Sequence, residues 1–182
     1  DLFSQNMAWA KSVKASRPDH FINLSQKHAP KYLWLGCSDS RVNPAKLLNL
    51  PAHEIFVHRN IANLVSNQDI NAMSVIQYAV DALSVKHIMI CGHRFCGGIK
   101  AVLEGQLSGP IREWLKPVVD LKASIADRLD EYSNQQRCDE LCKQNVIQQV
   151  INVCNSSTVQ GAWKRGEELF VHGWVYDLET GL

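Results

Sequence analysis

"KYLWLGCSDSRV", residues 31–42, contains an apolar segment that stops at a glycine and is followed at once by reactive side chains. The segment from Lys31 to Gly36 predicts a core strand. A thiol, two hydroxyls, an acid and a base then follow within five residues, from Cys37 to Arg41. We therefore ask why a buried strand ends in so many chemically active groups.

Two further strands and two helices follow this stretch. "EIFVH" (residues 54–58) and "HIMIC" (residues 87–91) predict strands, the second covered on both faces because it is apolar throughout. Apolar residues at helical spacing predict a helix over residues 71–83, and another is expected over residues 97–103. Alternating strands and helices are typical of an α/β fold with a parallel sheet.

The remaining segments are expected to be mostly helical. An amphipathic helix is predicted for residues 2–16 and a short one for residues 19–27. Residues 111–165 predict helices with an exposed break at "EYSNQQR", residues 131–137. A last strand is expected at residues 169–176.

Composition is that of an ordinary globular protein. The chain has 182 residues, 46% hydrophobic and 20% charged, with a net charge of +1, so we expect one domain and neither a nucleic-acid nor a membrane partner. The apolar runs are too short to span a bilayer, and no secretory signal is visible. For six cysteines in a chain of this size, reduced thiols and a cytoplasmic location are the expectation.

Three side chains have the character of metal ligands: Cys37, His93 and Cys96. Cys37 and His93 each follow a glycine just past a predicted strand, and parallel strands end at one edge of the sheet. Cys96 is expected at a helix N-terminus, which favours a thiolate. Two thiolates and one imidazole suit Zn²⁺, and three protein ligands leave a fourth position open, as in catalytic zinc sites. The alternatives are buried cysteines beside a satisfied histidine, or a structural site completed by Asp39 or a distant cysteine.

Asp39 and Arg41, two residues apart beside Cys37, can fold together as a carboxylate–guanidinium pair. The alternative is an ordinary surface salt bridge, which contributes little to stability. Its position next to a predicted ligand favours a role in the site.

"CSDSR" followed by "GHRFCGG" resembles the β-class carbonic anhydrases, in particular bacterial-type members. The stretches "EIFVHRNIAN", "SVIQYAVDAL" and "HGWVYD" extend the similarity over roughly residues 30–178. The resemblance implies zinc on the residues matching Cys37, His93 and Cys96, and reversible hydration of CO2 to bicarbonate by a zinc-bound hydroxide. It also implies an α/β sheet of about four parallel strands plus an edge strand, flanked by helices, and homodimers or homotetramers in which an N-terminal helical arm packs on the partner.

The resemblance further implies roles around the metal. Asp39, held by Arg41, would orient the hydroxide, and in some members the matching aspartate becomes a zinc ligand in a closed, inactive state that higher pH opens. In a subset, bicarbonate stabilises that state through residues matching Trp34, Arg59 and Tyr176. Taken without the resemblance, these three predict two core aromatics and a salt bridge.

Two departures from the family pattern stand out. Arg94 and Phe95 occupy the space between the ligands His93 and Cys96, where relatives often carry smaller or uncharged residues. The chain stops at Leu182, so we expect that the C-terminal part of the single family domain is missing. Rival functions are hydrolysis of CS2 or COS on the same fold, and a non-catalytic zinc-stabilised module.

Overall fold

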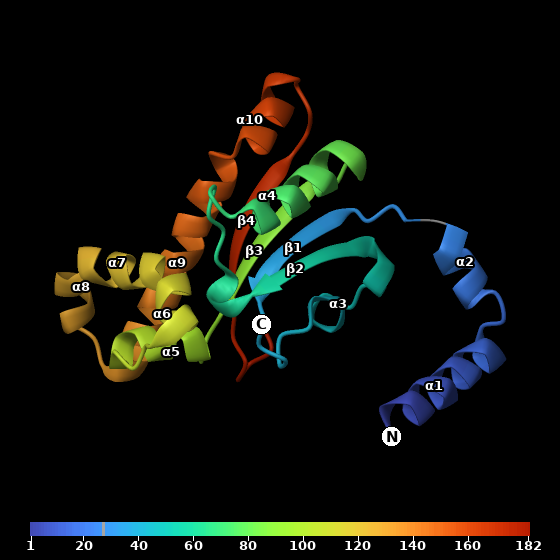
Figure 1. The fold of residues 1–182 in the computed structure, drawn as a ribbon, viewed down its shortest axis with the longest axis horizontal. Helices are drawn as coiled ribbons and strands as arrows, with labels where there is room; N and C mark the ends of the chain where they lie inside the picture. Colours follow the sequence, from blue (N-terminus) through green and yellow to red (C-terminus); the bar gives the residue numbers. More distant parts are fainter. Residues whose placement is uncertain (27) are drawn as a thin grey trace.

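Residues 32–37 form strand β1 of a four-stranded sheet. The strand order is β2-β1-β3-β4, and all neighbouring strands run parallel (Figure 1). The computed structural model describes residues 1–26 and 28–182. Its strands are β1 (Tyr32–Cys37), β2 (Ile55–Asn60), β3 (His87–His93) and β4 (Phe170–Tyr176). The predicted α/β class is confirmed. The edge strand expected in addition to about four parallel strands is β4, the fourth strand of the sheet. The sheet of the described residues therefore has four strands in total.

The strands reach further toward the site than the sequence predicts. The sequence predicts Cys37 and His93 just past their strands, but each is the last residue of its strand. Pairing continues to these ends, where Cys37 is in register with Asn60 and His93 with Tyr176. Backbone pairing does not require an apolar side chain, and the predicted ligands Cys37 and His93 therefore lie on paired strand backbone.

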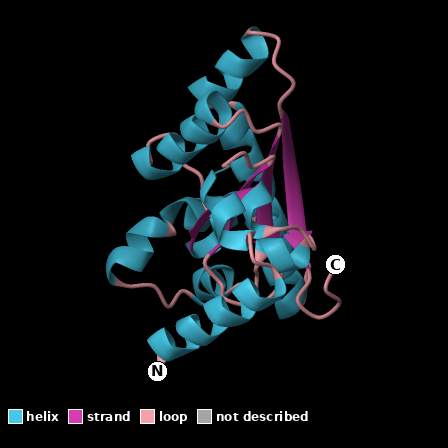
Figure 2. Ribbon diagram, turned by 90° about the vertical axis from the view of Figure 1, so that its right-hand side faces the viewer, coloured by secondary structure: helices cyan, strands magenta, loops and turns pink. Residues whose placement is uncertain are grey.

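Helices connect the strands and cover the sheet (Figure 1). Figure 2 shows most of them on one side of it. Each helix of the described chain is too short or too polar to cross a membrane. The helices are α1 (Leu2–Ser16), α2 (His20–Gln26), α3 (Pro44–Leu47), α4 (Ile70–Gln77), α5 (Gly97–Glu104), α6 (Gly109–Trp114), α7 (Lys116–Ser124), α8 (Ala126–Asp130), α9 (Asn134–Cys154) and α10 (Ser157–Lys164), with short 3-10 turns at η1 (Ala52–Glu54) and η2 (Ile61–Asn63).

Two helix predictions need correction. The single helix expected over residues 71–83 is α4 followed by a π-helical turn, η3 (Tyr78–Ala82), in which Leu83 N donates to Tyr78 O. The break predicted over residues 131–137 is shorter, because α9 begins at Asn134 behind a capping box of Ser133 and Gln136. The helix predicted to end at Lys27 is confirmed as far as Gln26, and its last residue lies outside the described ranges.

The core has a layer on each face of the sheet. On one face, side chains that include Leu33, Leu35, Ile88 and Ile90 are almost fully buried against helices such as α9. On the other face, Trp34 packs with Met89 and Cys91. Because β1 alternates between these layers, its end is held from both faces.

The N-terminal helices form the expected arm. α1 and α2 extend away from the sheet (Figure 1). Apolar side chains on the arm are exposed: Leu2 by 83%, Phe3 by 73% and Trp9 by 54%. Trp9 contacts Phe21 edge-to-face, with 5.6 Å between the ring centroids. The arm therefore carries apolar surface that its own chain leaves uncovered.

Replacing His172 by glutamine is expected to weaken the loss of stability on acidification. On β4, His172 Nε2 lies 3.1 Å from His87 Nδ1, and burial and then the charge of His87 lower the pKa of His172. The unfolded chain therefore takes up this proton first, and the free energy of unfolding falls as pH drops from about 7 to 5. Urea unfolding of His172→Gln across this range should show a smaller fall than wild type. The exposed His53→Gln serves as control, and an unchanged pH slope in His172→Gln would contradict the assignment.

Candidate metal centre

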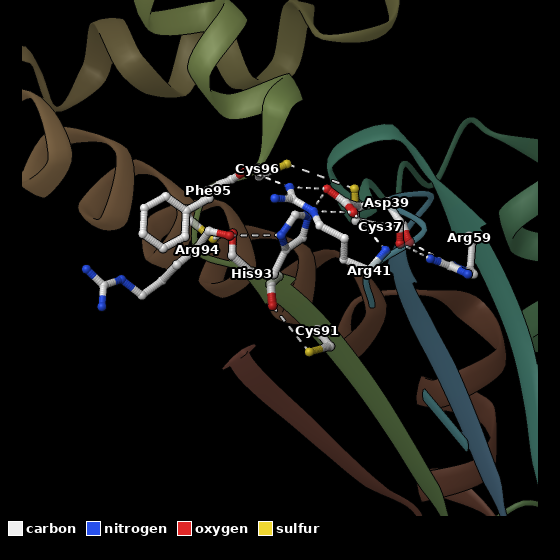
Figure 3. Close-up of polar contacts among 11 residues, drawn as sticks. Cys37, Asp39, Arg41, Arg59, Cys91, His93, Arg94, Phe95 and Cys96 are labelled. Atoms are coloured by element: carbon white, nitrogen blue, oxygen red, sulfur yellow. Dashed lines mark hydrogen bonds and ion pairs between the residues drawn. The ribbon is translucent and has the colours of Figure 1, made fainter. Parts of the chain in front are cut away.

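The predicted ligands meet at the carboxyl edge of the sheet (Figure 3). Cys37 ends β1, His93 ends the neighbouring β3, and Cys96 is the N-cap residue of α5. Their ligand atoms all lie within 4.8 Å of one another, and all three residues are buried. Residues 56 positions apart in the chain thus converge because β1 and β3 are parallel neighbours.

The geometry of this cluster fits zinc. The two sulfur atoms are 3.9 Å apart, close to the about 3.8 Å expected for two thiolates on a tetrahedral zinc with ~2.3 Å bonds. His93 is fully buried, and its Nδ1 lies 3.0 Å from Arg94 O, which only accepts, so Nδ1 carries the proton. His93 Nε2 is then a free acceptor, buried and without a hydrogen-bond partner among the described residues. A metal ion would satisfy this atom, which is otherwise an unfavourable unsatisfied buried polar group.

The hydrogen bond between the two sulfur atoms shifts the pKa values of Cys37 and Cys96 in opposite directions. The hydrogen bond with Cys96 is the main reason why the pKa of Cys37 is lowered, to about 4. The pKa of Cys96 is raised in turn, by the same hydrogen bond and by burial. The opposite shifts describe one proton held between two sulfur atoms, and a divalent cation would take the place of that proton.

Asp39 and Arg41 form the pair that their spacing predicts. Arg41 donates from Nε to Asp39 Oδ1 (2.9 Å) and from Nη2 to Oδ2 (2.7 Å), and its backbone N donates to Oδ1 (3.0 Å). The hydrogen bond from the Arg41 side chain is the main cause that lowers the pKa of Asp39 to about 2. Asp39 Oδ2 is 3.9 Å from His93 Nε2, so the carboxylate borders the ligands (Figure 3).

Arg59 forms hydrogen bonds to the backbone of residues 37–39, the segment that carries Cys37 and Asp39. Its Nε donates to Cys37 O (2.7 Å), and Nη2 donates to Asp39 O. Among the described residues Arg59 has no salt-bridge partner of the kind that the sequence alone suggests, and these hydrogen bonds go to backbone carbonyls. Arg59 thus ties the end of β2 to the segment that carries a ligand and a carboxylate.

Trp34 and Tyr176 belong to one apolar cluster beside β1 and β3. Trp34 is fully buried, and its Nε1 finds no hydrogen-bond partner within the described chain. The indole lies over Gly36, where an added Cβ would come within 2.1 Å of Nε1. Gly36 is in register with Arg59, and Tyr176 is in register with His93 at the end of β4. Arg59 and Tyr176 therefore lie near the carboxyl edge of the sheet, and the Trp34 indole extends toward this edge over Gly36.

Sequence reasoning missed a turn that supports Cys37. Ala62, in the left-handed region at φ 63°, provides a backbone hydrogen bond that contributes to the lowered pKa of Cys37. Its carbonyl accepts from Asn145 Nδ2 (2.9 Å) on α9, and Asn145 is 1% exposed. An alanine with positive φ leaves no signal in a sequence, and an asparagine 83 residues away offers none either.

Comparison with known proteins points to one family. The family model described as "Carbonic anhydrase" matches residues 32–182. Similar curated proteins are carbonic anhydrases of Emericella nidulans, 41% identical over all of this chain and 80% of the relative, and of Candida albicans, 39% identical over all of this chain and 65% of the relative.

Solved structures agree with the sequence comparisons. A β-carbonic anhydrase of Coccomyxa in complex with acetazolamide is 43% identical, with a TM-score of 0.92 over all of this chain and 82% of its own. One of two tetrameric β-carbonic anhydrases of Sordaria macrospora is 38% identical, with a TM-score of 0.94 over all of this chain and 92% of its own. With the family model, the relatives and the fold in agreement, the chain belongs to the β-class of the carbonic anhydrase family of enzymes.

Proposed function

We propose that the chain catalyses the reversible hydration of CO2 to bicarbonate and a proton, with zinc held by Cys37, His93 and Cys96. The observation that carries this proposal is the buried cluster of two thiols and one imidazole beside the Asp39–Arg41 pair. When bound, zinc supplies Lewis acidity that makes a hydroxide nucleophile available at a pH near neutral.

The residues of the chain orient this nucleophile. Two thiolates cancel the formal charge of a zinc ion, so we expect weaker acidification of water than with neutral ligands and a greater need for orientation. Asp39 is ionised at working pH, because its pKa is lowered to about 2, and its carboxylate is then purely an acceptor. By accepting a hydrogen from the nucleophile it directs a lone pair at the carbon of CO2, and Arg41 fixes the position of the carboxylate.

A pH-dependent switch is a second part of the proposal. In the proposed open state Asp39 stays in its bidentate pair with Arg41, and in the proposed closed state Asp39 would leave Arg41 and act as a fourth zinc ligand. The short distance from Asp39 Oδ2 to His93 Nε2, 3.9 Å, supports such an exchange. In this case the hydration rate rises as pH increases above neutral, and a flat pH profile would exclude the switch.

Bicarbonate is proposed to favour the closed state through Trp34, Arg59 and Tyr176. Support comes from the unpartnered, buried Nε1–H of Trp34, a donor of the kind that an anion requires. Arg59 adds a cation and Tyr176 a hydroxyl.

Trp34→Phe and Arg59→Ala are expected to lower the inhibition by added bicarbonate, because each removes a donor from the anion. Stopped-flow hydration at increasing bicarbonate concentration measures this. The control is Trp163→Phe, since Trp163 Nε1 already donates to Leu169 O (2.8 Å). Unchanged bicarbonate sensitivity in Arg59→Ala would remove the regulatory pocket from the proposal and leave the catalytic part intact.

Assembly into dimers or tetramers fits the exposed apolar side chains of α1 and α2. The Sordaria macrospora relatives are described as tetrameric. A second copy of the chain that covers this arm would bury its apolar surface. Light scattering after size exclusion gives the number of copies, and a monomer at micromolar concentration would contradict the assembly. The cytoplasmic location and the single-domain boundary stay predictions.

One experiment tests the central proposal: zinc content together with stopped-flow CO2 hydration across pH. About one zinc per chain and a hydration rate well above background are expected. Zinc-loaded protein without hydration even at alkaline pH would favour the non-catalytic zinc module, and higher activity on CS2 or COS in parallel assays would favour the hydrolase. Acetazolamide, present in the Coccomyxa structure, serves as a ligand with which to probe the same site.

A further inference from the structure

Arg94 lies between two proposed ligands but points away from them. Its side chain leaves the metal centre in the direction opposite to the thiols (Figure 3). The guanidinium donates to Asp139 Oδ2 from Nε (3.0 Å) and Nη2 (2.7 Å), and to Asp177 Oδ2 from Nη1 (2.9 Å). Asp139 is on α9 and Asp177 follows β4, so one side chain joins the ligand loop to two other elements.

The backbone of the same residue orients the histidine ligand. Arg94 O accepts from His93 Nδ1 (3.0 Å), which leaves Nε2 facing the thiols. Arg94 N donates to Tyr176 O (2.9 Å) at the end of β4. Any shift of the Arg94 peptide would therefore rotate the His93 imidazole or break its hydrogen bond.

The loop that carries this peptide contains a residue in an unfavourable backbone conformation. Phe95, the next residue, is in the left-handed region at φ 60°, a backbone conformation that is unfavourable for a residue with a side chain. Such a conformation persists only where surrounding contacts fix it. The contacts that fix it include the hydrogen bond from Arg41 Nη2 to Phe95 O (3.2 Å) on one side. On the other side, Arg94 N donates to Tyr176 O, and the Arg94 side chain pairs with the two aspartates.

We propose that Arg94 is a positioning residue of the metal centre: the ion-pair clamp Asp139–Arg94–Asp177 fixes the carbonyl that holds His93 in its metal-binding orientation. This inference rests on the proposed zinc site. The clamp is partly exposed, with 31% of the Arg94 side chain accessible, so as a plain surface ion pair it would contribute little to folding. Its effect on zinc should therefore exceed its effect on stability.

Arg94→Ala is expected to release zinc more readily to a competing chelator, with an affinity about 10- to 100-fold lower, the range typical for residues that orient metal ligands. Arg94→Lys should fall between wild type and Arg94→Ala, because lysine keeps the charge but not the two-armed hold. Cobalt-substituted protein should show a changed visible absorption spectrum, which a loss of stability alone would not produce.

The control is Arg165→Ala, which also removes an arginine bound to two carboxylates, Asp81 (3.2 Å) and Glu167 (2.6 Å), far along the chain from the ligands. It should leave zinc affinity unchanged. If Arg94→Ala fails to fold, the zinc affinity and the cobalt spectrum of Arg94→Lys and Asp139→Asn test the inference instead. If the zinc affinity of Arg94→Ala lies within twofold of that of Arg165→Ala and its cobalt absorption spectrum is unchanged, the inference is overturned. Wild-type protein that binds no zinc would instead overturn the proposed function.

Discussion

Cys96→Ala is expected to abolish both zinc binding and CO2 hydration. Cys96 supplies one of only two sulfur atoms in the cluster, 3.9 Å from the other. With one thiolate and one imidazole left, the site lacks the three protein ligands that a catalytic zinc requires. Hydration should fall to the uncatalysed rate, which for enzymes in general means a loss of about 10⁶-fold or more. Elemental analysis of the purified variant, with a stopped-flow assay in added zinc, measures both effects.

The matched control is Cys91→Ala, the same substitution at a thiol that is equally buried. Cys91 lies on the other face of the sheet with Trp34 and Met89, and burial raises its pKa to about 12. A thiol of this kind is inert toward metal, so Cys91→Ala should keep its zinc. Zinc retained in Cys96→Ala, or lost equally in both variants, would contradict the ligand assignment.

The arrangement of the ligands could be predicted because each carries a local sequence signal. Cys37 and His93 each come after an apolar run and a glycine, and parallel strands then bring both to one edge. The spacing of Asp39 and Arg41 likewise predicts their pair, since residues two apart in a turning segment can meet. These predictions needed only local pattern and the general geometry of a parallel sheet.

Other features depend on contacts that no local pattern contains. The sequence shows Arg94 as an unusual residue beside a ligand, but its partners Asp139 and Asp177 are 45 and 83 residues away. The π-helical turn Tyr78–Ala82 has the composition of an ordinary helix, so its wider hydrogen bonding cannot be read from side-chain periodicity. Tertiary packing determines both.

Asp39→Asn separates the role of the carboxylate from the presence of the metal. The amide keeps the size of the side chain, but it turns one oxygen that accepts from Arg41 into a donor, which faces Arg41 Nη2 or Nε. The remaining amide oxygen can then accept only one of the two Arg41 side-chain hydrogen bonds, and no anion is left to accept a hydrogen from the nucleophile. We expect a loss of about 10²- to 10³-fold in kcat/KM, as for the removal of one preorganised polar group, with zinc content unchanged.

Glu167→Gln is the control for Asp39→Asn, because Glu167 also pairs with an arginine two residues away, Arg165, at 2.6 Å. That pair is solvent-exposed and distant in sequence from the ligands, so its loss should leave hydration and zinc content as in wild type. Full activity in zinc-loaded Asp39→Asn would show that the nucleophile needs no carboxylate to orient it. The ligand assignment would survive that result, since it depends on Cys37, His93 and Cys96 alone, and the cause of catalysis would then have to lie with the metal and its ligands.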